Sequence, residues 1–139
     1  MKDIIEFFNI KNYRLEVNEN TSVYYWFRDV ILDEIGETIY SRYTMKNDPI
    51  LRKSGIYKLI KDGEVVYIGM SVNIMDRLTT HVYNKVIDFN SIYFYTIEGI
   101  NKEGLRGIES RMIERFKPIY NIQGTSKKSK NWTVNLKFS

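Results

Sequence analysis

The chain has no cysteine and only one histidine, His81, in 139 residues. Without cysteine there is no disulfide and no thiolate metal site, so any metal ion must be bound through oxygen or nitrogen atoms. The chain therefore needs no oxidising compartment. An intracellular, cytoplasmic location is the default expectation.

Membrane and export signals are missing as well. No apolar run reaches the length that spans a bilayer. Asp3 and Glu6 interrupt the apolar start of the chain, which does not have the pattern of a signal peptide. We therefore expect no membrane partner, and a location in the host cytoplasm if a phage encodes the protein.

Apolar content and basic charge are what the chain does have. Its residues are 43% hydrophobic and 14% aromatic, which suits one domain with its own core and leaves no room for a second. The net charge of +4 is uneven, because residues 1–50 are acidic overall and residues 51–139 carry fifteen Lys or Arg against eight Asp or Glu. This surplus suits a polyanion such as DNA, although many basic domains of this size bind no nucleic acid.

The residue pattern divides the chain into three parts. Residues 1–53 predict a helical extension that packs on the core, with a short helix at Asp3–Asn9, an irregular segment, and a longer helix. That longer helix is capped by Thr21 or Ser22 and ends near Gly36.

Residues 54–122 predict the core. A β-hairpin turns at Asp62-Gly63, and the elements that follow are a helix at Asn73–Val86, a strand at Ser91–Ile97 and a helix at Glu103–Phe116. The expected fold class is α/β, of the α+β sandwich kind. It has a small antiparallel three-stranded sheet flanked by helices, and the core order is β-β-α-β-α.

Residues 123–139 form a basic segment, in which Lys127, Lys128 and Lys130 are candidate nucleic-acid contacts. Apolar and polar residues then alternate over residues 132–138, which predicts a terminal strand. It could pair with an edge of the same sheet or with a second copy of the chain, so a homodimer is possible and the sequence does not choose.

Glu109 is the anomaly of the second core helix. At 100° per residue it falls in the middle of the apolar face formed by Leu105, Ile108, Met112, Ile113 and Phe116. Burying an isolated charge is costly enough that this carboxyl group must bind a proton or a cation. An ion pair with an arginine and a metal site both meet that need. Glu114 projects from the opposite face and is expected to be solvated.

Arg77 and His81 lie four residues apart in the first core helix, so they share one face beside its apolar stripe. There an arginine can bind a phosphate through two parallel hydrogen bonds, and a histidine can transfer a proton near neutral pH. Tyr57 and Tyr67 in the hairpin could place hydroxyl groups opposite them. The alternatives are a solvated arginine, a surface histidine and tyrosines that only pack.

Together these residues resemble the GIY-YIG nucleases. Gly55-Ile56-Tyr57 and Tyr67-Ile68-Gly69 look like the family's paired motifs and are separated by nine residues that contain the turn. The similarity continues in order and spacing through Ser71, Asn73 and Arg77, the run Gly107-Ile108-Glu109 with Ile113, and Lys117-Pro118-Ile119-Tyr120-Asn121. It covers residues 54–122, half of the chain.

The resemblance implies a metal-dependent endonuclease that hydrolyses DNA phosphodiester bonds. Glu109 would be the sole protein ligand of one divalent ion per active site, Mg²⁺ or Mn²⁺, with water and phosphate oxygens completing its shell. Tyr57 would activate or orient the attacking water, with His81 as the proton acceptor. Arg77 would hold the phosphate and stabilise charge in the transition state.

Two further residues have roles by the same resemblance. Tyr67 would complete the hydrogen-bond network, and Asn121 would hold the site's geometry from behind. Met70 departs from the family, because many members have a lysine there. His81 stands where other members have tyrosine, which looks more like the restriction-endonuclease branch than the repair branch.

The biological role stays open. The candidates are a restriction-like or phage-encoded nuclease that cuts duplex DNA, a homing-type nickase, and a single-strand nuclease, with duplex DNA the favoured substrate. The alternative from another class is a catalytically silent nucleic-acid-binding or inhibitor protein that keeps the fold. The complete set of site residues argues against it, because a retired site has no chemical need for a carboxylate on an apolar face.

Overall fold

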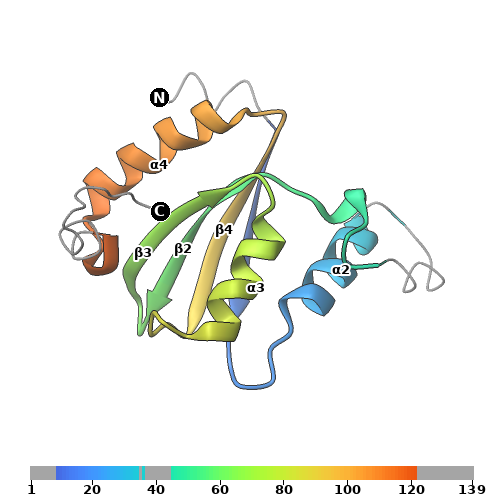
Figure 1. The fold of residues 1–139 in the computed structure, drawn as a ribbon, viewed down its shortest axis with the longest axis horizontal. Coiled ribbons are helices and arrows are strands. Elements are labelled where there is room, and N and C mark those ends of the chain that lie inside the picture. The colour runs from blue at the N-terminus through green and yellow to red at the C-terminus, as the bar shows by residue number, and fades with distance from the viewer. Residues whose placement is uncertain (1–8, 35, 37–44, 122–139) are drawn as a thin grey trace.

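The computed structural model describes residues 9–34, 36 and 45–121 (Figure 1). In chain order the elements are β1 (Asn9–Glu16), α2 (Val23–Glu34), the short 3-10 helix η2 (Pro49–Leu51), β2 (Gly55–Lys61), β3 (Glu64–Ser71), α3 (Ile74–Asn84), β4 (Ser91–Glu98) and α4 (Lys102–Phe116). The α+β class and the β-β-α-β-α order from residue 55 onward are confirmed. None of the described helices combines the length and apolar character needed to cross a membrane.

The sheet has four antiparallel strands in the order β1-β4-β2-β3, one more than predicted. The additional strand is β1, which lies in the segment expected to be irregular and pairs with β4 over its full length, from Asn9↔Glu98 to Glu16↔Ser91. Only Leu15 of β1 is buried. The strand therefore lacks the regular alternation of buried and exposed residues that marks a strand in a sequence. Its strand conformation comes from pairing with β4, which a local pattern does not reveal.

Some expectations lie outside the described residues. The predicted helix at Asp3–Asn9 falls there except for Asn9, which belongs to β1 instead. The terminal strand, Lys127, Lys128 and Lys130 lie there as well. The division of the chain into extension, core and basic segment stays a prediction.

The sheet has helices on both faces, as Figure 1 shows. One core lies between the sheet and helices α2 and α3, and Phe27, Tyr57, Leu78 and Phe94 belong to it. The other lies between the sheet and α4, and Ile56, Ile68, Ile97, Leu105 and Ile108 belong to it. Phe116 was predicted on the buried face of α4 but is 42% exposed. That expectation was wrong, because the last turn of α4 leaves this ring at the surface.

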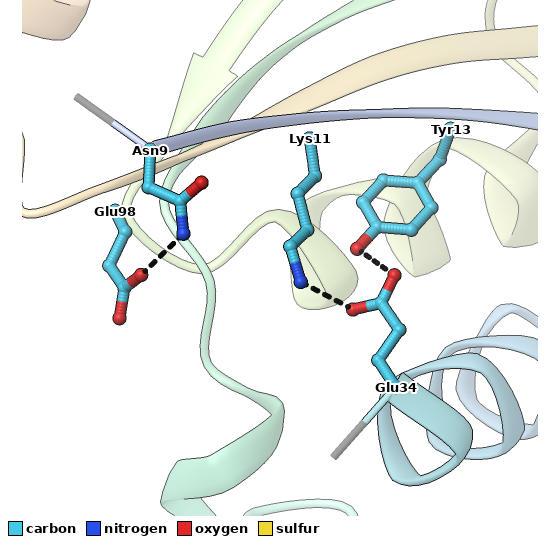
Figure 2. Close-up of polar contacts among 5 residues, drawn as sticks. All are labelled: Asn9, Lys11, Tyr13, Glu34 and Glu98. Carbon is cyan, nitrogen blue, oxygen red and sulfur yellow. Dashed lines mark hydrogen bonds and ion pairs between the residues drawn. The ribbon is translucent and has the colours of Figure 1, made fainter. Parts of the chain in front are cut away.

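Side chains of β1 connect the first strand to α2, and Figure 2 shows the contacts. Glu34, the last residue of α2, accepts a hydrogen bond from the Tyr13 hydroxyl at 2.7 Å and pairs with the Lys11 ammonium at 3.4 Å. Asn9 donates to Glu98 of β4 at 3.2 Å. The N-terminal part of the chain is thereby joined to the same sheet that carries the hairpin.

Asparagine caps set the starting points of the two helices that carry candidate residues. The side chain of Asn73 accepts a hydrogen bond from the backbone N–H of Asp76 at the start of α3, and Asn101 accepts one from Gly104 at the start of α4. Such caps satisfy N–H groups that have no partner within the helix. Lys117, in the left-handed region at φ 47°, ends α4 directly before Pro118.

Candidate functional site

Tyr57 is fully buried on β2, opposite Gly69 on β3. A Cβ atom at position 69 would overlap with the Tyr57 hydroxyl group and its ring. The glycine of the second motif therefore provides the space into which the tyrosine of the first motif extends. Sequence spacing did not predict this dependence, because it arises from the pairing of the two strands.

Three rings meet at this position. The Tyr57 hydroxyl lies 2.8 Å from Nε2 of His81 on α3, within hydrogen-bonding distance. The ring centroids are 5.3 Å apart for Tyr57 and His81, 5.4 Å for Tyr67 and His81, and 6.2 Å for Tyr57 and Tyr67. The structure thus brings together three of the five residues predicted to be catalytic.

The hydrogen bond between Tyr57 and His81 joins two uncharged groups. Burial raises the pKa of Tyr57 far above its ordinary value, and the nearby Tyr67 raises it further. Burial, followed by the positive charge of Arg77, lowers the pKa of His81 to about 4. At neutral pH the phenol keeps its proton and the imidazole is uncharged, so Tyr57 can donate to Nε2 in the tautomer that carries the ring proton of His81 on Nδ1.

Arg77 is exposed on α3, one helical turn before His81. Its positive charge opposes the raised pKa of Tyr57, contributes to the lowered pKa of His81 and opposes the raised pKa of Glu109. An effect on all three groups requires that the guanidinium lie near each of them. Arg77 therefore links the tyrosine and histidine pair to the carboxylate of the other helix.

Glu109 is partly buried on α4. Burial raises the pKa of its carboxyl group to about 7, against the opposing positive charges of Arg106 and Arg77. Within residues 9–34, 36 and 45–121 it makes no hydrogen bond and no ion pair shorter than 4.0 Å. The alternative of a direct structural ion pair is therefore not found there. Arg106 was not anticipated, although its position three residues before Glu109 places the two on adjacent parts of the helix. Glu114 is exposed, as expected.

The donor set around Glu109 is small. The described part of the chain contains no cluster of three His, Cys, Asp or Glu side chains that could hold a metal ion. A single carboxylate without a hydrogen-bond partner fits a cation that takes most of its ligands from water and phosphate, as Mg²⁺ commonly does. It does not fit a metal that needs a full set of protein ligands.

Asn121 lies behind the site and is 2% exposed. Its Oδ1 accepts a hydrogen bond from the backbone N–H of Ile68 at 2.8 Å, and its Nδ2 donates to the Ile68 carbonyl at 2.9 Å. These two bonds occupy the free edge of β3 at the residue between Tyr67 and Gly69. The segment after α4 is thereby attached to the strand that carries the second motif.

Met70 occupies the position where a lysine is expected from the family. It is partly buried and packs against the core beneath α4. The side chain therefore contributes to packing and not to the charge of the site. The positive charges that act on Glu109 come from Arg106 and Arg77, and none comes from position 70.

No protein-family model and no curated protein sequence matches the chain. Solved structures similar to it include the N-terminal GIY-YIG endonuclease domain of UvrC from Thermotoga maritima. The sequence motifs described above resemble the GIY-YIG family. One point mutant, bound to its catalytic divalent cation, is 17% identical with a TM-score of 0.44, over 50% of this chain and 82% of that one. The magnesium-bound domain is 20% identical with a TM-score of 0.36, over 50% of this chain and 84% of that one.

Proposed function

We propose that this chain is a metal-dependent endonuclease that hydrolyses DNA phosphodiester bonds. The observation that carries the proposal is the 2.8 Å contact between the Tyr57 hydroxyl and Nε2 of His81, at a place where the charges of Arg77 and Glu109 both act on Tyr57. A phosphate-binding cation, a hydrogen-bonded proton acceptor and a carboxylate without a partner therefore share one place. Metal-dependent phosphodiester hydrolysis uses these three functions.

Tyr57 and His81 provide a path for the proton of the attacking water. The Tyr57 oxygen accepts that proton while its own hydroxyl proton moves to Nε2 of His81, 2.8 Å away. Neither side chain has to ionise beforehand, which agrees with the raised pKa of Tyr57. The tyrosine thus acts as a relay and the histidine as the final base.

The lowered pKa of His81, caused first by burial and then by the positive charge of Arg77, makes it a weak base in the free protein. A phosphate bound to Arg77 would offset that positive charge and raise the pKa of His81 towards its ordinary range. Substrate binding would thereby strengthen the base only when there is a bond to cleave. Two parallel hydrogen bonds from the guanidinium would orient the phosphate at the same time.

Glu109 is the residue that would hold the metal ion. Its unpartnered carboxylate can exchange a proton for a cation, so metal binding would strengthen as the pH rises through about 7. A divalent ion bound there would neutralise phosphate charge and stabilise the leaving oxygen. Mg²⁺ or Mn²⁺, one ion per site, suits this donor set.

The same proposal includes the substrate, the residues that contact it, the way both strands are cut and the cellular role. Duplex DNA is the substrate, and Lys127, Lys128 and Lys130 contact it beyond the core of residues 54–122. A chain with one site cuts both strands by forming a homodimer, by acting twice or by nicking. The protein acts inside the cell, in a restriction-like or phage-encoded role.

The test is a timed incubation with supercoiled plasmid and with single-stranded DNA, with and without Mg²⁺. Glu109→Gln is compared with Glu114→Gln, which changes an exposed carboxylate of the same helix. We expect cutting that needs metal, is lost at least a hundredfold in Glu109→Gln and is retained in Glu114→Gln. Cutting by Glu109→Gln at the wild-type rate contradicts the metal role. No cutting by any protein, with DNA binding retained, supports the catalytically silent alternative.

A further inference from the structure

The sheet face opposite Tyr57 carries a groove of about 650 Å³. Among the described elements, α4 covers this face by packing on β3 and β2. The groove lies beside α4, over the strands nearer β1. We name it the aromatic-basic groove; Lys58, Tyr95, Arg111, Met112, Arg115 and Phe116 line it.

Strand register brings rings and cations together beside this groove. Tyr93 on β4 lies between Arg14 on β1 and Lys58 on β2, as the direct cross-strand partner of both. The Arg14 guanidinium carbon is 5.2 Å from the centre of the Tyr93 ring, and the Lys58 ammonium is 5.5 Å from it. Lys58 also lies 5.4 Å from the Tyr95 ring and 5.1 Å from the Phe116 ring.

The charge of the aromatic-basic groove is of one sign. Lys58, Arg111 and Arg115 line it, and no carboxylate does, as far as the described residues go. None of the three makes an ion pair with that part of the chain. Arg111 and Arg115 are four residues apart on α4, so both reach the same side of the helix. The arrangement favours an anionic partner.

The rings decide which kind of anion fits. Phe116 on α4 is 42% and Tyr93 on β4 37% exposed, so both rings present an apolar surface that a partner can contact. A DNA duplex presents phosphates outward and keeps its bases stacked inside, so it would leave this apolar surface unused. A single strand offers unstacked bases to rings and phosphates to cations, which is how single-stranded nucleic acid is generally bound.

We propose that the aromatic-basic groove binds single-stranded nucleic acid. Tyr57 and Lys58 are successive residues of β2, so their side chains lie on opposite faces of the sheet. The groove therefore lies on the other sheet face from Tyr57, and none of Tyr57, Arg77, His81 and Glu109 lines it, although Glu109 belongs to the same helix as Arg111 and Arg115. The inference does not require that site to be catalytic, because it concerns binding alone.

The test measures binding of a fluorescent oligothymidine in EDTA by anisotropy. The full chain is compared with the double variant Arg111→Glu/Arg115→Glu and with Phe116→Leu, and circular dichroism checks that each is folded. We expect the double variant to bind at least tenfold more weakly, with a smaller dependence of affinity on salt because fewer counterions are released. Phe116→Leu should bind about fivefold more weakly with an unchanged salt dependence, because it removes stacking and keeps the charge.

The matched control is Lys46→Glu/Lys102→Glu, which makes the same charge change at exposed positions outside the groove. Its affinity should stay within about threefold of the wild type. Equal losses in the control and in the arginine variant overturn the proposal, as does wild-type binding by Phe116→Leu. Duplex binding that falls as much as single-strand binding in Arg111→Glu/Arg115→Glu also overturns it, as does polyglutamate that competes equally well. Without divalent metal the assay reads binding only, so its failure would leave the nuclease proposal untouched.

Discussion

Gly69 and Tyr57 face each other across β3 and β2, and the missing side chain of Gly69 is what allows the Tyr57 hydroxyl to reach His81. The two named motifs therefore form one structural unit. The glycine of the second sets the position of the tyrosine of the first. The catalytic proposal depends on this position, because the hydroxyl must lie between the water and the histidine.

Gly69→Ala should lower the free energy of unfolding and displace Tyr57. Inserting one methyl group into a packed interior generally costs about 1–3 kcal/mol. Gly107→Ala is the control, because a Cβ at that helical position meets no atom within 4 Å, and alanine favours a helix over glycine by about 1 kcal/mol. Urea unfolding of both variants checks the prediction. A Gly69→Ala protein as stable as the wild type would show that the ring adjusts without cost.

Asn121→Ala should destabilise the chain and free the edge of β3. The substitution leaves the backbone N–H and C=O of Ile68 without their buried partner, and each such group costs about 1–3 kcal/mol. We expect a loss of about 2–4 kcal/mol and faster hydrogen exchange of the Ile68 amide. Asn12→Ala, at an exposed position on β1, should change neither. Unchanged exchange at Ile68 would contradict the role given to Asn121.

Glu109 should make the chain less stable as the pH rises. Its pKa is about 7 in the folded chain against an ordinary 4.5, so the folded state holds a proton that the unfolded state releases. Stability therefore falls between pH 4.5 and 7 and stays low above that range. Allowing for the partial exposure of the group, the effect is about 1–2 kcal/mol.

Urea unfolding of the wild type and Glu109→Gln between pH 5 and pH 8 tests this dependence. The variant should gain stability relative to the wild type as the pH increases. Their difference cancels the contribution of His81, whose lowered pKa gives a slope of opposite sign between pH 4 and 6.5. Glu114→Gln should show no such trend, and a pH-independent difference for Glu109→Gln would contradict the raised pKa.

Local patterns predicted the elements whose sequence signals are self-contained. The hairpin has its turn at Asp62 and Gly63, both in the left-handed region at φ 49° and 87°, and the two core helices follow from the helical spacing of their apolar residues. Strand β1 escaped prediction because its conformation depends on β4, more than 70 residues away. Its alternation is also weak, since one residue of eight is buried.

Some features of the candidate site could likewise be predicted from the sequence, and others could not. The anomaly of Glu109 and the shared face of Arg77 and His81 follow from helical periodicity, so the sequence could indicate them. The contact between Tyr57 and His81 depends on how far α3 lies from β2, and the space at Gly69 depends on strand register. The spacing of residues along the sequence gives neither this contact nor this space, so both had to be found in the structure. The aromatic-basic groove needed the order of all four strands.

The most direct test of the central claim is the single-turnover rate of plasmid cleavage in Mg²⁺ for Tyr57→Phe, Glu109→Gln and the double variant. If the two residues serve one transition state, each single change should slow cleavage at least a hundredfold. The double variant should then be far less impaired than the product of the two effects. Wild-type cleavage by either single variant would contradict the account.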